Sequence, residues 1–211
     1  MKELPLFPLG VTLFPQGRLP LQIFEVRYLD MIGKCHRGGT PFGVVSLVTG
    51  SEVERAGPGP GRTEQFVSVG TLAEIRQLTN PQAGLLQIET CGTQRFRLHD
   101  PRRLPHGLWV ADAELLANDP VLSIPADLQD TADRLGALIR RLQEAGVTPD
   151  QMPFLPPYHL DDCGWVANRW GEILPTPPTV RQTLLAEDNP LIRLELISDL
   201  LDELPDGVAE R

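Results

Sequence analysis

Apolar and polar residues alternate along much of the first half of the chain, and this pattern predicts strands. Two apolar runs, residues 19–24 and 42–48, are short enough to be strands. A further strand is expected over residues 67–75, where one alternating phase carries Val67, Val69, Thr71, Ala73 and Ile75. Residues 80–84 read Asn-Pro-Gln-Ala-Gly, which predicts a turn before the next strand.

The strand pattern continues over residues 86–98 and 108–116. In the first of these we expect Leu86, Ile88, Phe96 and Leu98 on one face and Arg95 and Arg97 on the other. Glycines at positions 43, 70 and 92 stand where strands bend or bulge. Strands at this spacing predict a small, strongly curved barrel.

Helical spacing is found once early in the chain and then throughout its second half. Residues 25–37 place Val26, Leu29, Ile32 and Cys35 near one helical face, and Gly38-Gly39 ends that helix. After residue 118, helices are expected over 128–145, 162–174 and 189–204, with a short helical turn over 176–185. Asp161 or Asp162 is expected to cap one helix and Asn189 another, whereas four prolines exclude a regular helix from residues 147–160.

The first thirty residues also carry a long motif. It reads Leu-Pro-Leu-Phe-Pro-Leu-Gly at 4–10, Leu-Phe-Pro at 13–15, Leu-Pro-Leu at 19–21 and Ile-Phe-Glu-Val-Arg-Tyr at 23–28. This motif resembles the opening of the Lon protease N-terminal domain family, and Gln182-Thr-Leu-Leu185 with Arg193-Leu194 extends the resemblance. The resemblance implies an α+β fold: a PUA-like β-barrel over residues 1–117, then a small helical bundle over 118–211.

Bulk composition narrows the class of protein. With 41% hydrophobic and 22% charged residues, the chain has the composition of a globular protein, and no stretch approaches a membrane-spanning helix. Three widely spaced cysteines and the absence of a leader-like start predict reduced thiols in the cytoplasm. The net charge of −9 opposes binding to nucleic acid unless a local basic patch dominates.

Motifs for catalysis and for cofactor or metal binding are absent from the sequence. Neither lysine lies in a Gly-x-x-x-x-Gly-Lys-Ser/Thr loop. Residues 57–61 form a glycine-rich stretch, but its alternating prolines lack the N–H donors that a phosphate-binding loop needs. Cys35 and His36 would point apart on a helix, and the region His159–Cys163 lacks zinc-site spacing. We therefore expect no enzyme and no cofactor, although a hydrolytic site without a recognisable motif stays an alternative.

Two sets of residues are candidates for binding. The resemblance implies recognition of protein substrates, and four aromatic residues would serve a polypeptide site if exposed: Phe154, Tyr158, Trp165 and Trp170. The alternative is RNA binding, since PUA-type barrels occur in RNA-modifying proteins and basic residues gather at Arg95, Arg97, Arg102 and Arg103. Charge protecting a strand edge would explain the same arginines. We expect a free-standing adaptor for unfolded or specific protein partners, with homo-oligomerisation open.

Overall fold

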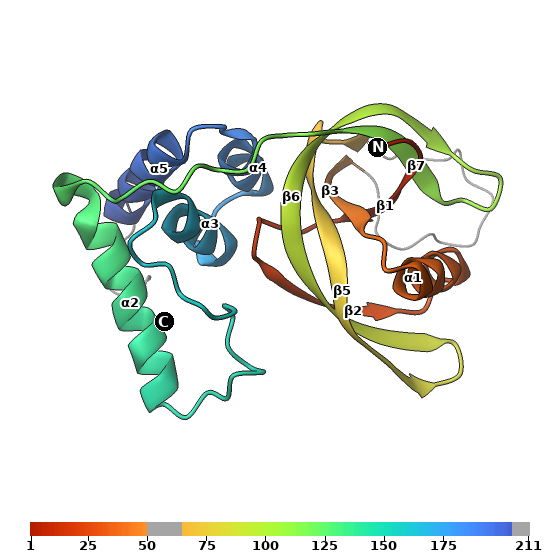
Figure 1. The fold of residues 1–211 in the computed structure, drawn as a ribbon, viewed down its shortest axis with the longest axis horizontal. Coiled ribbons are helices and arrows are strands. Elements are labelled where there is room, and N and C mark those ends of the chain that lie inside the picture. Colours follow the sequence, from red (N-terminus) through yellow and green to blue (C-terminus); the bar gives the residue numbers. More distant parts are fainter. Residues whose placement is uncertain (50–64, 204–211) are drawn as a thin grey trace. The chain divides into compact units, whose positions relative to one another are not determined.

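The computed structural model describes residues 1–49 and 65–203, which fall into two compact units. The first unit spans Met1–Ala117 and the second begins at Asn118. The glycine- and proline-rich segment expected to be a loop, residues 51–64, lies outside the described residues. Each unit is described by itself below (Figure 1).

The first unit is a closed β-barrel. Its strands are β1 (Leu4–Leu9), β2 (Arg18–Ile23), β3 (Phe42–Thr49), β4 (Gln65–Phe66), β5 (Val69–Gln82), β6 (Leu85–Arg103) and β7 (Trp109–Leu115). Hydrogen-bonded neighbours follow the order β1-β7-β6-β5-β3, and a parallel pairing of β1 with β3 completes the ring. The predicted barrel is therefore confirmed, while β4 and β2 attach to β3 and β6 outside the ring.

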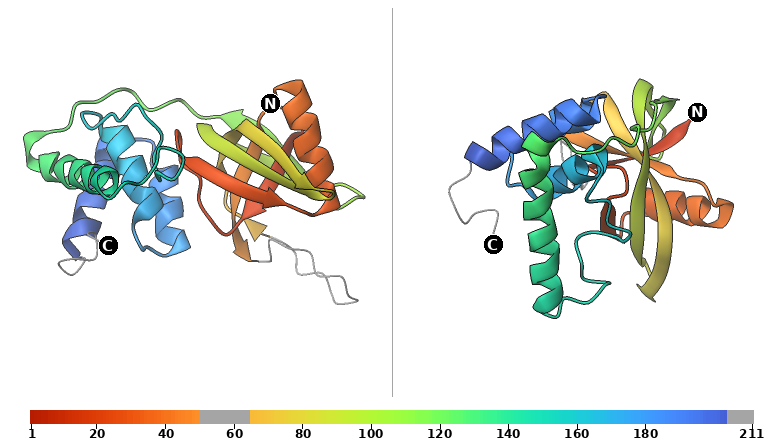
Figure 2. Two further views of the ribbon diagram at one scale, coloured as in Figure 1. Left: turned by 90° about the horizontal axis from the view of Figure 1, so that it is seen from below. Right: turned by 60° about the vertical axis from the view of Figure 1, so that its left-hand side comes forward.

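The long strands β5 and β6 lie side by side in the barrel wall and extend beyond it (Figures 1 and 2). β6 pairs with β2 along its first half and with β7 along its second half. Ile88 therefore packs in one apolar cluster and Phe96 in another, so the prediction that they share a face is wrong. A strand of 19 residues in a curved sheet changes neighbours along its length, which simple alternation does not anticipate.

Two close approaches explain why glycine is needed in these strands. A Cβ atom on Gly92 would lie 2.2 Å from the backbone oxygen of Phe14, and one on Gly70 would lie 2.5 Å from the backbone oxygen of Val44. Neither backbone atom can move aside without distorting the barrel. Gly92 thus allows the segment between β1 and β2 to cross β6 closely, with the Gln16 N–H donating to its carbonyl at 2.7 Å.

Helix α1 (Val26–Gly38) packs its apolar face onto the barrel strands. Gly39, at φ 61°, ends the helix as predicted. The buried face is made by Tyr28, Met31, Ile32 and Cys35, whereas Val26 is 80% exposed. Placing Val26 on the buried face was wrong, because it stands at the first helical position, before the turn that meets the core.

Two charged residues of the opening motif, Glu25 and Arg27, form an ion pair at the start of α1. Arg27 is buried, donates to the Glu25 carboxylate at 3.0 Å and to the Gly107 carbonyl at 3.0 Å, and lies over the Tyr28 ring. Its guanidinium therefore ties the start of α1 to the β6–β7 hairpin.

The second unit is helical. It contains α2 (Gln129–Glu144), α3 (Cys163–Ile173), α4 (Pro178–Ala186) and α5 (Pro190–Glu203), with a short 3-10 turn at Ala126–Leu128. The caps appear as predicted: the Asp162 carboxylate accepts from the Trp165 N–H at 3.0 Å, and the Asn189 side chain accepts from the Leu191 N–H at 3.0 Å. α4 is a full helix where only a turn was expected.

A buried arginine links the elements of this unit. Arg193 on α5 is fully buried, and its guanidinium donates to the Asp119 carboxylate, the Asn168 side chain and the Leu184 carbonyl. A further bond goes to the carbonyl of Glu187. Since these partners come from the start of the unit, α3, α4 and the α4–α5 connection, one side chain fixes four segments.

Candidate functional site

The four aromatic residues expected to bind polypeptide lie in the helical unit, and three of them are interior. Phe154 is 0% exposed, Trp165 3% and Trp170 1%, and only Tyr158 is half-buried. The Trp170 ring N–H donates to the Thr131 carbonyl at 2.9 Å, and the Phe154 and Tyr158 rings pack near Trp165. The condition on which these residues were candidates, exposure to solvent, is therefore not met by Phe154, Trp165 and Trp170, whose rings are buried in the core.

The arginine cluster is divided by the fold. Arg95 is only 3% exposed, and its carbonyl accepts a hydrogen bond from the Leu116 N–H at 3.0 Å. Arg97, Arg102 and Arg103 are exposed. Predicting Arg95 and Arg97 together on a solvent face was thus wrong for Arg95.

Carboxylates accompany two of the three exposed arginines, whereas the Arg103 side chain donates to the Gly107 carbonyl at 3.3 Å. Arg102 pairs with Glu3 at 2.6 Å and lies 3.9 Å from Asp112, while Glu114 stands opposite Arg97 in the β6–β7 register. The same Glu114 contacts His99 at 3.1 Å. This mixture of both signs is poorly suited to a phosphate backbone, which needs a local excess of positive charge.

No arrangement of thiols or metal ligands in the described parts of the chain suggests catalysis. Cys35, Cys91 and Cys163 are all buried, and desolvation raises the pKa of Cys35 and Cys163, so their reactive thiolate forms are disfavoured. Within residues 1–49 and 65–203, no group of three or more His, Cys, Asp or Glu side chains could hold a metal ion. In the region His159–Cys163, Asp162 serves as the helix cap instead.

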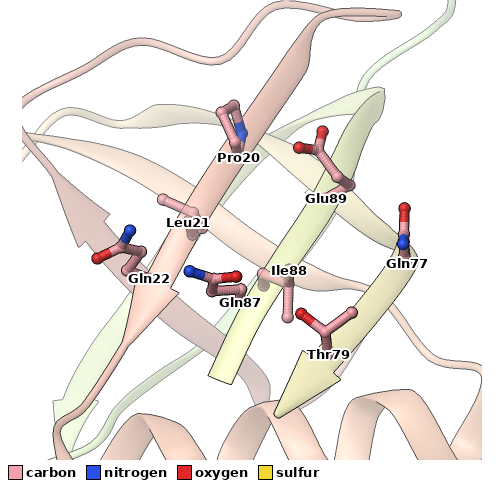
Figure 3. Close-up of a pocket in the computed structure, with 8 residues that line it drawn as sticks. All are labelled: Pro20, Leu21, Gln22, Gln77, Thr79, Gln87, Ile88 and Glu89. Atoms are coloured by element: carbon pink, nitrogen blue, oxygen red, sulfur yellow. The ribbon is translucent and has the colours of Figure 1, made fainter. Parts of the chain in front are cut away.

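A shallow groove of about 500 Å³ lies on the barrel where β2, β6 and β5 run side by side (Figure 3). Strand register arranges its exposed side chains in two rows across the three strands. Pro20, Glu89 and Gln77 form one row, and Gln22, Gln87 and Thr79 form the other. The intervening positions Leu21 and Ile88 turn toward the core, as alternation requires.

The groove is close to electrically neutral. Its one carboxylate, Glu89, accepts a hydrogen bond from Arg18 at 2.7 Å. The other polar lining residues are three glutamines and a threonine, which carry no charge. An occupant would therefore be selected by hydrogen bonding and shape, with little contribution from long-range electrostatics.

An exposed phenylalanine follows the groove strand β2 in the sequence. Phe24 follows β2 directly, two residues after Gln22, and is 55% exposed, whereas Phe7, Phe14, Phe42, Phe96 and Phe154 are all buried. Val26 adds a second exposed apolar side chain close by in sequence. Both are exposed apolar side chains in the short stretch between β2 and the start of α1, where a partner could contact them.

Sequence reasoning missed the groove. The alternation of Gln77, Thr79, Gln87 and Glu89 around apolar neighbours indicates an outward face, and could have been noticed. The addition of β2 to β6 was not visible in the sequence, because it joins residues about seventy positions apart.

The chain is similar to several known proteins. Residues 3–203 match the family model of the ATP-dependent protease La (LON) substrate-binding domain. The chain belongs to this family. A Lon N-terminal domain protein from Xanthomonas campestris has a crystal structure that is similar with a TM-score of 0.72 and 30% identity, over 97% of this chain and 100% of that one. The predicted family is therefore confirmed.

Two further relatives of the LON-domain chain are more distant. The N-terminal domain of Mycobacterium avium complex Lon protease shares the fold at a TM-score of 0.60, with 15% identity over 97% of this chain and 100% of that one. Protein cereblon of Danio rerio is 28% identical over 155 residues, which are 72% of this chain and 34% of cereblon. The chain thus spans about a third of that relative's length.

The family match covers a substrate-binding domain and includes no protease or ATPase domain. Among the helices of the described residues, none has the length and apolar content to cross a membrane.

Proposed function

We propose that this LON-domain chain is a cytoplasmic, non-catalytic module that binds extended or unfolded polypeptide and presents it to a partner, as an adaptor. Membership of the substrate-binding family supports a protein ligand. The observation that carries the proposal is the open groove on β2, β6 and β5, which is uncharged overall. Such a surface suits a polypeptide, whose main chain is polar but neutral and whose side chains are partly apolar.

The direct test is a fluorescence-anisotropy titration of a labelled, permanently unfolded polypeptide with the purified chain, without nucleotide. We expect saturable binding that changes little between low and high salt, because the groove contributes no net charge. The labelled polypeptide should also stay intact after long incubation with the protein, as a non-catalytic module requires. Absence of binding at both salt concentrations would refute the proposal.

The same titration with labelled single-stranded RNA tests the alternative function, RNA binding. Recognition of RNA through Arg97, Arg102 and Arg103 would weaken steeply as salt rises. We expect no such salt-dependent binding, because Arg102 pairs with Glu3 and Arg97 stands opposite Glu114, so carboxylates offset much of this positive charge.

A further inference from the structure

The two side-chain rows of the groove have the geometry of an extended peptide. Along one strand, residues two positions apart lie about 6.8 Å apart, and this distance is also the repeat of an extended main chain. Gln87 and Glu89 on β6, and Gln77 and Thr79 on β5, are spaced in this way. A segment lying along the strands would meet both rows at equivalent main-chain positions.

The chemistry of the rows suits the same ligand. A glutamine amide offers both a donor and an acceptor, as a peptide group does, so each can bond to a main-chain N–H or C=O. Gln22, Gln77 and Gln87 are exposed and make no side-chain hydrogen bond to another described residue. They come from three neighbouring strands and therefore lie across the width of the groove.

Other occupants fit less well. A charged segment gains little, because Arg18 already neutralises Glu89, the one charged lining residue. Nucleic acid would need cations along the groove, and carbohydrate or bases would need an aromatic platform; the lining has neither. A second copy of this chain would need a larger complementary surface than a shallow groove of this size.

We propose that the groove holds an extended, uncharged polypeptide segment along β2, β6 and β5, and that the amides of Gln22, Gln77 and Gln87 bind its main chain. Recognition is then tolerant of sequence, since the bonds go to groups that every non-proline residue carries. This inference rests on the proposed polypeptide binding and specifies its site and its chemistry.

Substitutions in the groove test whether it is the binding site. With the labelled unfolded polypeptide as probe, the double variant Gln77→Ala with Gln87→Ala should bind about tenfold more weakly than the natural chain, since two hydrogen-bonding groups are lost. Gln143→Ala removes an exposed amide from α2 in the other unit and should leave binding unchanged. Circular dichroism should show that all three chains are folded, because every substituted residue is exposed.

Competition by short neutral peptides tests the chemistry. Methylation of the main-chain nitrogen at every second residue of the peptide removes half of its N–H donors. Two such peptides can be made, methylated at odd or at even positions, and at least one of them should no longer compete. Scrambling the side-chain order of the same peptide should change its competition by no more than a few-fold. Scrambling that abolishes competition would overturn main-chain recognition in favour of side-chain recognition.

The results separate this inference from the general function. If the natural chain binds the unfolded polypeptide and the Gln77→Ala, Gln87→Ala chain binds it equally well, the groove is not the site but polypeptide binding stands. If the natural chain does not bind, both proposals fail. Weaker binding that is accompanied by dimer loss in analytical ultracentrifugation would show that a second copy occupies the groove, and would overturn the inference.

Discussion

The groove of the barrel and the interior of the helical unit hold polar side chains in opposite ways. In the helical unit, Arg193 and Arg169 are completely buried and are held by carboxylates and carbonyls within the unit. On the barrel, a set of neutral amides stays exposed over three strands. Polar groups satisfied inside a unit specify its packing, whereas polar groups left at the surface are available for a ligand. The first set therefore has a structural role, and the second set is where we propose that a ligand binds.

The largest expected effect comes from removing the buried cation of the helical unit. Arg193→Ala leaves Asp119 and several carbonyls without their partner in the interior, which should lower the free energy of unfolding by about 3–5 kcal/mol. Urea unfolding followed by circular dichroism measures the change. Arg140→Ala, on the exposed side of α2, is the control and should stay within about 0.5 kcal/mol. If both substitutions lowered the free energy of unfolding equally, the hydrogen bonds of Arg193 would not have the structural role proposed for them.

Glu172 should give this unit a pH dependence. Burial raises the pKa of its carboxyl to about 7, although Arg169, at 2.9 Å, acts in the opposite direction. Because the folded protein then holds this proton more tightly than the unfolded chain, the contribution of Glu172 to stability should fall as pH rises from about 4.5 to about 7 and stay flat above.

The variant Glu172→Gln isolates that contribution. Relative to the natural chain, it should gain up to about 3 kcal/mol of unfolding free energy across this pH range. Glu195→Gln, exposed on α5, is the matched control and should show no such trend. A constant difference between Glu172→Gln and the natural chain at every pH would contradict the raised pKa.

In the barrel, the corresponding vulnerable point is a backbone contact. Gly92→Ala brings a Cβ to 2.2 Å from the Phe14 oxygen and should cost about 1–3 kcal/mol, with the loss of hydrogen-exchange protection confined to the barrel. Gly38→Ala is the control, since the nearest atoms to its Cβ would be 3.6 Å away. Protection lost equally from both units would show that they do not unfold separately.

The smallest effect is expected at a helix end. Asp162→Ala removes the acceptor for the Trp165 N–H and for the Leu122 N–H, at 3.0 Å each, and should cost about 1 kcal/mol by thermal unfolding. Asp161→Ala, next to it and exposed, should be neutral. A larger effect at Asp161 would mean that the cap has been assigned to the wrong residue.

Much of the helical unit could be predicted from sequence because its signals are local. Caps at Asp162 and Asn189, apolar spacing in α2 and α5 and the proline-rich segment each act within a few residues. The exposure of individual side chains was predicted less well. Trp165 and Trp170 were candidates for binding only if exposed, and they are buried, while Phe24 was not named as a candidate and is exposed.

The sequence by itself determined the family, most of the strands and helices, and the absence of a recognisable catalytic motif. It did so because motifs, caps and alternation are properties of neighbouring residues. The burial of Arg95 and Arg193, and the meeting of Gln22, Gln87 and Thr79 in one row, came from the tertiary structure. These features depend on strand register and on contacts between distant segments, which determine which of several locally equivalent faces is covered.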